Sequence, residues 1–276
     1  MSNLVRAQAI NQPVAREKKA RKGTPSWVKG LVLPLLIIVV WQIFSSSGVV
    51  SATVLPSPIQ IVETFYGLVV SGLLFGHLQI SIYRAVVGFL LGASIALVLG
   101  FIVGFSKRSE SYLDPTMQML RTIPSLAVTP LFILWFGFDE LSKILLIAFA
   151  SFFPVYVNTY NGIRSVDSKL FEVAQVLEFS KWKQLTKLIL PSALSHILVG
   201  VRLSLGIAWL SLVVAELMGS SAGVGYMIMD ARQFSQTDKV FVGIIIFGVV
   251  GKLTDSLVRI LEQKLLKWRT SFEGVE

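Results

Sequence analysis

The chain consists of long apolar stretches separated by shorter polar connections. Six stretches stand out, at residues 31–44, 81–105, 123–138, 144–157, 197–217 and 240–260. A helix needs about 20 mostly apolar residues to cross the hydrocarbon layer of a membrane, which is roughly 30 Å thick. Prolines interrupt the third and fourth stretches, which membrane helices tolerate where neighbouring helices satisfy the freed carbonyl groups. The pattern predicts an all-α integral membrane protein with six transmembrane helices.

Composition narrows the class of protein. Hydrophobic residues make up 54% of the 276 residues and charged residues only 15%, whereas roughly a quarter of an ordinary globular domain is charged. The mean hydropathy is +0.71. These values argue against a soluble enzyme, a disordered chain and a disulfide-stabilised secreted module. The absence of cysteine also removes thiolate catalysis and cysteine-based metal sites.

The positive charges predict the orientation in the membrane. Lys and Arg concentrate in residues 1–30, in the connections after the second and fourth stretches, and at the C-terminal end. The opposite connections hold only Lys143, Arg232 and Lys239. Because Lys and Arg favour the cytoplasmic side of a membrane, both termini are predicted to be cytoplasmic. This distribution accounts for the formal net charge of +9 without a nucleic-acid partner.

Between the first two stretches the chain predicts a shorter, amphipathic helix. Leu55-Pro56-Ser57-Pro58 is typical of an extended turn. The apolar residues that follow have helical spacing: Ile61, Val62, Phe65, Leu68 and Val69. We expect this helix to lie at the outer surface or against the bundle.

The longest inner connection, residues 161–196, predicts two short amphipathic helices joined by a turn. Phe171, Ala174 and Leu177 form one apolar face, and Leu185, Leu188 and Ile189 form a second. Pro191 is expected to end the second helix. On this pattern alone the connection could present a compact surface to a cytoplasmic partner or float on lipid.

A resemblance to a known family favours a cytoplasmic partner for this connection over lipid. The segment resembles the EAA loop of ATP-binding cassette (ABC) importer permeases, whose pattern is E-A-A, three residues, G, nine residues, I-x-L-P. The matching residues are Glu172, Ala174, Leu190 and Pro191, with Leu188 a conservative match for the Ile. In that family the loop couples the permease to a groove of the ATP-binding subunit, so the resemblance implies that role for these five residues.

This chain departs from the motif at two positions. Val173 replaces the second Ala, and Glu178 stands where the motif has Gly. Glycine adopts positive φ at almost no steric cost, which other residues do not. We therefore expect either a more open turn or a bend at Phe179-Ser180.

The resemblance extends over about residues 31–270. Segments such as 118–124, 134–137 and 223–226 resemble the permeases for sulfonates, taurine and nitrate, and 154–159 and 231–238 resemble the aliphatic sulfonate permeases most. The resemblance implies a type I importer permease fold and a function in uptake of aliphatic sulfonates by alternating access. It also implies a homodimer, ATP-binding subunits, an extracytoplasmic binding protein and a bacterial inner membrane.

The expected organisation has four parts. They are a basic cytoplasmic arm at 1–28, a first transmembrane helix with the outer amphipathic helix at 29–74, a permease core at 75–262 and a cytoplasmic tail at 263–276. We expect lipid to surround the chain and anionic lipid to lie near the arm. Two alternatives stay open: the same machine with taurine, nitrate, bicarbonate or an aromatic sulfonate as cargo, and an ATPase-independent channel or membrane scaffold.

Ionisable residues within the apolar stretches are candidates for function, because charge at membrane depth is costly. Arg84 and Arg202 lie about one turn from span ends, where long side chains can reach the interface; the alternative is that one faces the path and attracts an anion. Glu216 is expected to act as a gate or to contact a helix terminus or Arg232. Lys252 and Asp255 are spaced to pair with each other, with Arg259 one turn beyond.

The sequence offers no sign of catalytic or metal chemistry. Gly248 and Gly251-Lys252 suggest a phosphate-binding loop, but the spacing is too short and Leu253 stands where Ser or Thr is needed. No Ser-His-Asp grouping, paired polar carboxylates or metal-ligand spacing is present. We therefore predict a non-enzymatic subunit without a cofactor of its own, with ATP bound by its partner.

Small residues recur along the apolar stretches. They include Gly88, Gly92, Gly100, Gly104, Gly200 and Gly206. Glycine allows two membrane helices to approach closely, so we expect ordinary close packing at these positions.

Overall fold

A computed structural model describes residues 26–266, and these residues form helices and connections without a strand. The all-α prediction is confirmed. Most of the predicted basic arm and C-terminal tail lies outside the described residues. The helices are α1 (Ser26–Ser46), α2 (Pro58–Val70), α3 (Leu73–Phe105), α4 (Lys107–Arg121), α5 (Ser125–Phe136), α6 (Glu140–Arg164), α7 (Ser168–Val176), α8 (Lys181–Gln184), the π-helical turn η1 (Leu185–Ile189), α9 (Leu190–Gly219), α10 (Val224–Gln233) and α11 (Thr237–Leu265).

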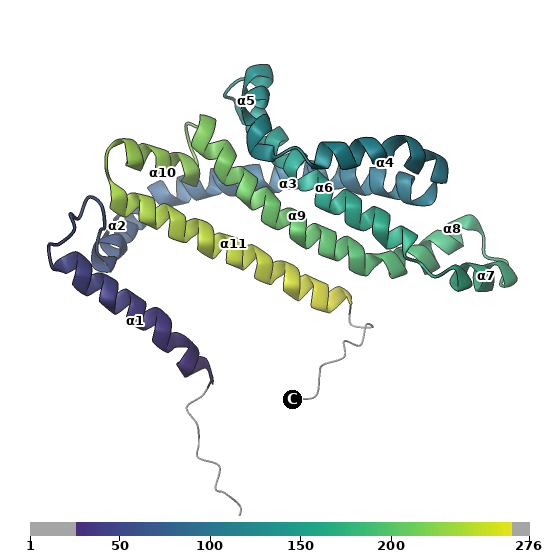
Figure 1. Ribbon diagram of the computed structural model, residues 1–276, viewed down its shortest axis with the longest axis horizontal. Coiled ribbons are helices and arrows are strands. Elements are labelled where there is room, and N and C mark those ends of the chain that lie inside the picture. The colour runs from purple at the N-terminus through teal and green to yellow at the C-terminus, as the bar shows by residue number, and fades with distance from the viewer. Residues whose placement is uncertain (1–25, 267–276) are drawn as a thin grey trace, which may run out of the picture.

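The bundle is built around α6, which lies against both α3 and α9 (Figure 1). Figure 1 shows α7 and α8 at one end of the long axis and α2 and α10 at the other, here called the α7 end and the α10 end. The first residues of α1 and the last residues of α11 both point toward the α7 end. The described ends of the chain thus point toward the end that carries the 161–196 connection.

Glycine lets α3 approach α6 closely. Gly88, Gly92, Gly100 and Gly104 all face α6, and a Cβ at Gly92 would lie 2.3 Å from the carbonyl oxygen of Ala148. Gly200 also lies close to α6, as predicted: a Cβ there would lie 2.7 Å from the Cβ of Asn158. Gly206 differs from the prediction, because no atom lies within 4 Å of the Cβ position there. Five of the six positions therefore carry close helix contacts.

Replacing Gly92 with alanine is expected to lower the free energy of unfolding by about 1–3 kcal/mol, because the backbone of α6 must move to admit the methyl group. Gly206→Ala is the matched control and should leave stability unchanged or slightly higher, because alanine is the better helix former. Denaturant unfolding in detergent micelles checks both variants. Equal stability of the two variants would contradict this account of the packing.

The predicted amphipathic helix is α2. Ser57 caps it, accepting from the N–H of Gln60, whose side chain in turn accepts from the N–H of Ser57. Ile61 and Leu68 are buried in the bundle, and Thr64 donates to Asp238 at 2.6 Å. Of the two expected positions, α2 adopts the one against the bundle.

Four described helices are long and apolar enough to cross a membrane: α3, α6, the continuous helix formed by α8, η1 and α9, and α11. The third predicted stretch is short. Its helix α5 joins α4 across a bend of 98°, and only the two helices together are long enough to cross a membrane. The apolar part of α1, Gly30–Ser46, is also shorter than the four long helices. The count of six crossings stays a prediction.

Candidate functional site

The predicted coupling loop is organised by one short helix. α7 exposes Glu172 and turns Ala174 inward, where its side chain is buried. Asp167 caps the helix by accepting from the N–H of Lys169. The first of the two predicted short helices is therefore present, and it separates an exposed carboxylate from a buried small residue.

The second predicted helix does not end at Pro191. Residues Lys181–Gly219 form one continuous helix, with the π-helical turn Leu185–Ile189 just before the proline. In an α-helix the ring of Pro191 would clash with a carbonyl one turn earlier; the wider turn moves that carbonyl away, and the N–H of Leu190 bonds to Leu185 instead. Ser192 donates to the Leu188 carbonyl at 2.8 Å. The loop is thus joined rigidly to a long bundle helix.

The turn after α7 bends at Glu178, and both expected alternatives for it are wrong. Glu178 has φ of 50°, in the left-handed region that glycine favours. Its N–H bonds to Gln175 and the N–H of Phe179 bonds to Ala174, at 3.0 and 2.9 Å. These two bonds form a Schellman motif, which satisfies carbonyl groups at the end of α7. Glutamate thus adopts the conformation that the family motif assigns to glycine.

Glu178→Gly is expected to stabilise this turn by up to about 1 kcal/mol, because glycine removes the steric cost of a left-handed residue. Gln175→Gly, within α7, is the control and should destabilise the helix by about 1 kcal/mol. Hydrogen exchange of the loop amides measures both effects. Faster exchange in Glu178→Gly than in the unsubstituted chain would argue against the strained turn.

The loop presents an apolar surface, called here the α7 face. Val176 is 83% exposed, and the other members are Leu170, Val173, Leu177 and Trp182. A contiguous patch of exposed apolar side chains usually marks a surface that binds another protein or a membrane. The described residues of the chain do not cover this face.

A buried ionic network lies at the α10 end. Arg84 has no exposed surface and is held by two carboxylates from different helices. Its Nε and Nη2 donate to Glu140 at 2.6 and 2.5 Å, and its Nη1 donates to Glu216 at 2.8 Å. Nη1 also donates to the carbonyl of Ala222 at 2.6 Å. Arg84 therefore does not reach the interface, as one prediction had it; it joins α3, α6 and α9.

Glu216 is also completely enclosed. It accepts from Ser81 at 2.7 Å and from the N–H of Gly225, in the first turn of α10, at 2.7 Å. A Cβ at Gly223 would lie 2.3 Å from its carboxylate, so glycine is needed there for the α10 turn to approach. The expected helix-terminus contact is thus present, but the cation is Arg84, and Arg232 makes no hydrogen bond or ion pair to Glu216.

Arg202 belongs to a second, more exposed cluster. Its Nε donates to Asp255 at 2.9 Å, and Glu262 lies 3.9 Å away. Asp255 also pairs with Lys252 at 3.8 Å and Arg259 at 3.4 Å. The predicted trio is present, with Arg202 as an additional member from α9. The structure therefore separates Arg202 from Arg84 and Glu216.

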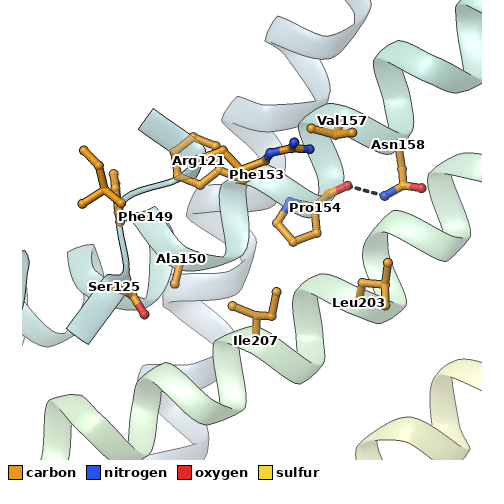
Figure 2. A pocket seen from close by; sticks show the side chains of 11 residues that line it. Arg121, Ser125, Phe149, Ala150, Phe153, Pro154, Val157, Asn158, Leu203 and Ile207 are labelled. Carbon is orange, nitrogen blue, oxygen red and sulfur yellow. Dashed lines mark hydrogen bonds between the residues drawn. The ribbon is translucent and has the colours of Figure 1, made fainter. Parts of the chain in front are cut away.

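None of these charged residues lines the cavity between α5, α6 and α9, which has a volume of about 400 Å³ (Figure 2). The charged residue in its wall is Arg121, at the end of α4. In the sequence, Arg121 belongs to the basic connection after the second apolar stretch, which the positive charges assign to the cytoplasmic side. Its place at the cavity could have been suspected from its position directly before Thr122-Ile123-Pro124, where α4 ends and the chain bends.

Comparison with known proteins identifies the family. Residues 88–267 match the family described as binding-protein-dependent transport system inner membrane component. The chain belongs to this family. Its members are components of membrane transport systems rather than enzymes, so the prediction of a non-enzymatic ABC permease is confirmed. The matched range includes the coupling loop and the two carboxylates Glu140 and Glu216 of the ionic network, whereas Arg84 lies just before it.

Individual relatives agree with this membership. The chain is 70% identical over 264 residues to SsuC of Bacillus subtilis (strain 168), whose name assigns it to aliphatic sulfonate transport, covering 96% of this chain and 95% of that protein. It is 47% identical over 240 residues to SsuC of Escherichia coli (strain K12), covering 87% and 91%.

A solved structure supports the fold. A chain of an amino acid ABC transporter crystallised with histidines matches with a TM-score of 0.61 at 16% identity, covering 72% of this chain and 97% of that one. The similarity confirms the importer permease fold and, at this identity, carries no information on cargo.

Proposed function

We propose that this chain is the permease subunit of an ATP-driven importer that takes up aliphatic sulfonates. The observation that carries the proposal is the 70% identity, over nearly the full length of both proteins, to a permease named for aliphatic sulfonates. The exposed α7 face and the membrane-length helices support the same function, because an importer needs both a partner surface and a path.

The α7 face is the docking surface for the ATP-binding subunit. Glu172 is exposed beside it and offers a carboxylate to donors on that subunit, while Ala174 packs inward and supports the helix. Leu188, Leu190 and Pro191 attach the surface to the long helix. The chain binds no cofactor of its own in this proposal; ATP is held by the partner.

The long helix Lys181–Gly219 provides the mechanical connection. It starts beside the α7 face, passes Leu203 and Ile207 in the cavity wall, and reaches Glu216 in the buried network. A displacement of α7 by the ATP-binding subunit is therefore transmitted along one helix to the opposite end. ATP binding favours one of two conformations, and hydrolysis returns the other, which produces alternating access.

The complex contains two copies of this chain around one path, two ATP-binding subunits on the cytoplasmic side and a binding protein on the outer side. The α7 end faces the cytoplasm of a bacterial cell, with both termini on that side. The positive charges near that end and the direction of α1 and α11 support this orientation. Lipid surrounds the apolar outer surface.

Uptake of labelled ethanesulfonate tests the proposal in cells that lack this chain, with the chain restored beside its transporter subunits. Restored uptake that unlabelled ethanesulfonate abolishes is the expected result. No uptake of ethanesulfonate by the assembled complex, with uptake of labelled taurine, nitrate or bicarbonate instead, would assign another cargo. Ion flux that needs no ATP-binding subunit would instead indicate a channel.

A further inference from the structure

The cavity between α5, α6 and α9 has two chemically different parts. One wall is apolar and includes Phe149, Phe153, Leu203 and Ile207. The polar groups are Arg121, Ser125 and Asn158. Its volume of about 400 Å³ lies in the range of small-molecule sites. Such a lining suits a ligand with an apolar chain and a small polar head.

Arg121 lies at the end of α4, which packs against α3 and reaches α6 through side-chain contacts. Glu110 and Asp114 lie on the α4 face that meets α6: Glu110 accepts from Tyr160 at 2.5 Å and pairs with Arg164, and Asp114 accepts from Tyr156 at 3.0 Å. Arg121 lies seven residues after Asp114, two helical turns along the same face. The contacts that hold α4 therefore also direct Arg121 toward the middle of α6.

In the part of the chain that the structure describes, Arg121 has no charged partner. Among residues 26–266, no hydrogen bond or ion pair involves its side chain, and the α4 carboxylates on the same face already have the partners just named. The buried Arg84, by contrast, is fully occupied by two carboxylates and a carbonyl. Arg121 is exposed at the cavity wall, so its guanidinium is open to an anion that enters the cavity.

Asn158 contributes a second donor at the same cavity. Its Nδ2 donates to the carbonyl of Pro154 at 2.8 Å, a bond that fixes the amide and leaves its second N–H for a ligand. Figure 2 shows the Arg121 guanidinium near Val157 and Asn158 of α6, with Leu203 and Ile207 of α9 across the cavity. The polar contacts thus come from α4 and α6, and the apolar contacts from α6 and α9.

We propose that this cavity binds the alkanesulfonate during translocation, with the sulfonate at Arg121 and Asn158 and the alkyl chain against Phe153, Leu203 and Ile207. This assignment rests on the sulfonate-import function proposed above. A sulfonate carries one negative charge over three acceptor oxygens, which the planar guanidinium can bind through two N–H groups. The apolar wall favours the chain by about 0.8 kcal/mol for each CH₂ removed from water. Arg121 and the wall therefore determine specificity separately.

The test uses proteoliposomes containing the complete transporter and a saturating amount of its binding protein, with ethanesulfonate and hexanesulfonate as probes. Arg121→Gln is expected to lower the uptake of both by about tenfold or more, the loss typical of a charged hydrogen-bond partner. Arg121→Lys should retain part of the activity. Arg108→Gln is the matched control, since Arg108 is exposed on the same helix and outside the cavity, and it should transport normally.

Leu203→Phe separates the chain contact from the head contact. It narrows the apolar part of the cavity and should reduce hexanesulfonate uptake several-fold more than ethanesulfonate uptake, whereas Arg121→Gln should reduce both by the same factor. If these residues only stabilised the fold, both variants would reduce the uptake of ethanesulfonate and hexanesulfonate by the same factor.

The outcomes distinguish the two proposals. Normal uptake of both sulfonates by Arg121→Gln, or an identical loss in Arg108→Gln, overturns the site while the importer function stands. Equal effects of Leu203→Phe on both probes overturn the chain contact. No sulfonate uptake by the unsubstituted transporter, although it is assembled and hydrolyses ATP, overturns the proposed function.

Discussion

Replacing Arg84 with methionine is expected to lower the free energy of unfolding by about 3–5 kcal/mol, the loss seen when one partner of a buried ion pair is removed. Methionine keeps much of the volume but removes every donor. Glu216, which is only 1% exposed, then keeps a negative charge supported only by Ser81 and the N–H of Gly225. Denaturant unfolding in mixed micelles measures the loss.

A double-mutant cycle shows whether the loss comes from the unpaired carboxylate. Glu216→Gln removes that charge, so Arg84→Met with Glu216→Gln should be clearly less destabilised than the sum of the two single variants. Arg202→Met is the matched control and should cost far less, because both Arg202 and Asp255 are partly exposed to solvent. Additive single effects would contradict a direct coupling of Arg84 to Glu216.

Val176→Asp is expected to weaken binding of the ATP-binding subunit by about tenfold or more and to abolish sulfonate uptake. Val176 is 83% exposed, so the substitution leaves the fold of this chain intact, but it places a charge in the centre of the α7 face. A charge buried at an interface without a partner costs several kcal/mol. Co-purification of the ATP-binding subunit, followed by uptake, measures the effect.

Val49→Asp provides the control for that experiment. Val49 is 73% exposed and lies in the connection before α2, at the end of the molecule opposite α7. It should retain the ATP-binding subunit fully. If Val176→Asp also retains the subunit and transports normally, the α7 face is not the docking surface.

The sequence predicts the helices of this chain well because apolar stretches of membrane length have few other outcomes. Each of the six predicted stretches contains a helix, although in the third, 123–138, the helix is only Ser125–Phe136, and α2 follows from the spacing of Ile61 and Leu68. The sequence also locates the coupling loop, since Glu172 and Pro191 match a spaced motif. Local pattern and family resemblance together were enough for the architecture.

The details of the loop depend on tertiary contacts that a pattern does not contain. Pro191 normally ends a helix, yet a π-helical turn lets the helix pass through it. Glu178 adopts a left-handed conformation that local preference assigns to glycine, because two hydrogen bonds at the end of α7 hold it there. In both cases the surrounding helix outweighs the preference of a single residue.

The positions of the charged residues also depend on tertiary contacts that a sequence pattern does not contain. Lys and Arg positions indicate which side of the membrane a connection occupies, but they do not show how far a helix folds back. The charge pattern therefore assigns Arg121 only to its connection, whereas α4 brings it to the cavity beside α6. Arg84 is enclosed because it pairs with Glu140 and Glu216, and these residues are too remote in sequence for a local pattern to reveal the pairing.

The most direct test of the central claim is the accumulation of labelled ethanesulfonate inside proteoliposomes. They contain this chain, its ATP-binding subunit and ATP in the lumen, and the sulfonate-loaded binding protein is added outside. The account predicts accumulation above the outside concentration that requires ATP and all three components. Accumulation that persists without ATP, or none although ATP is hydrolysed and the binding protein carries sulfonate, would contradict an ATP-driven sulfonate importer.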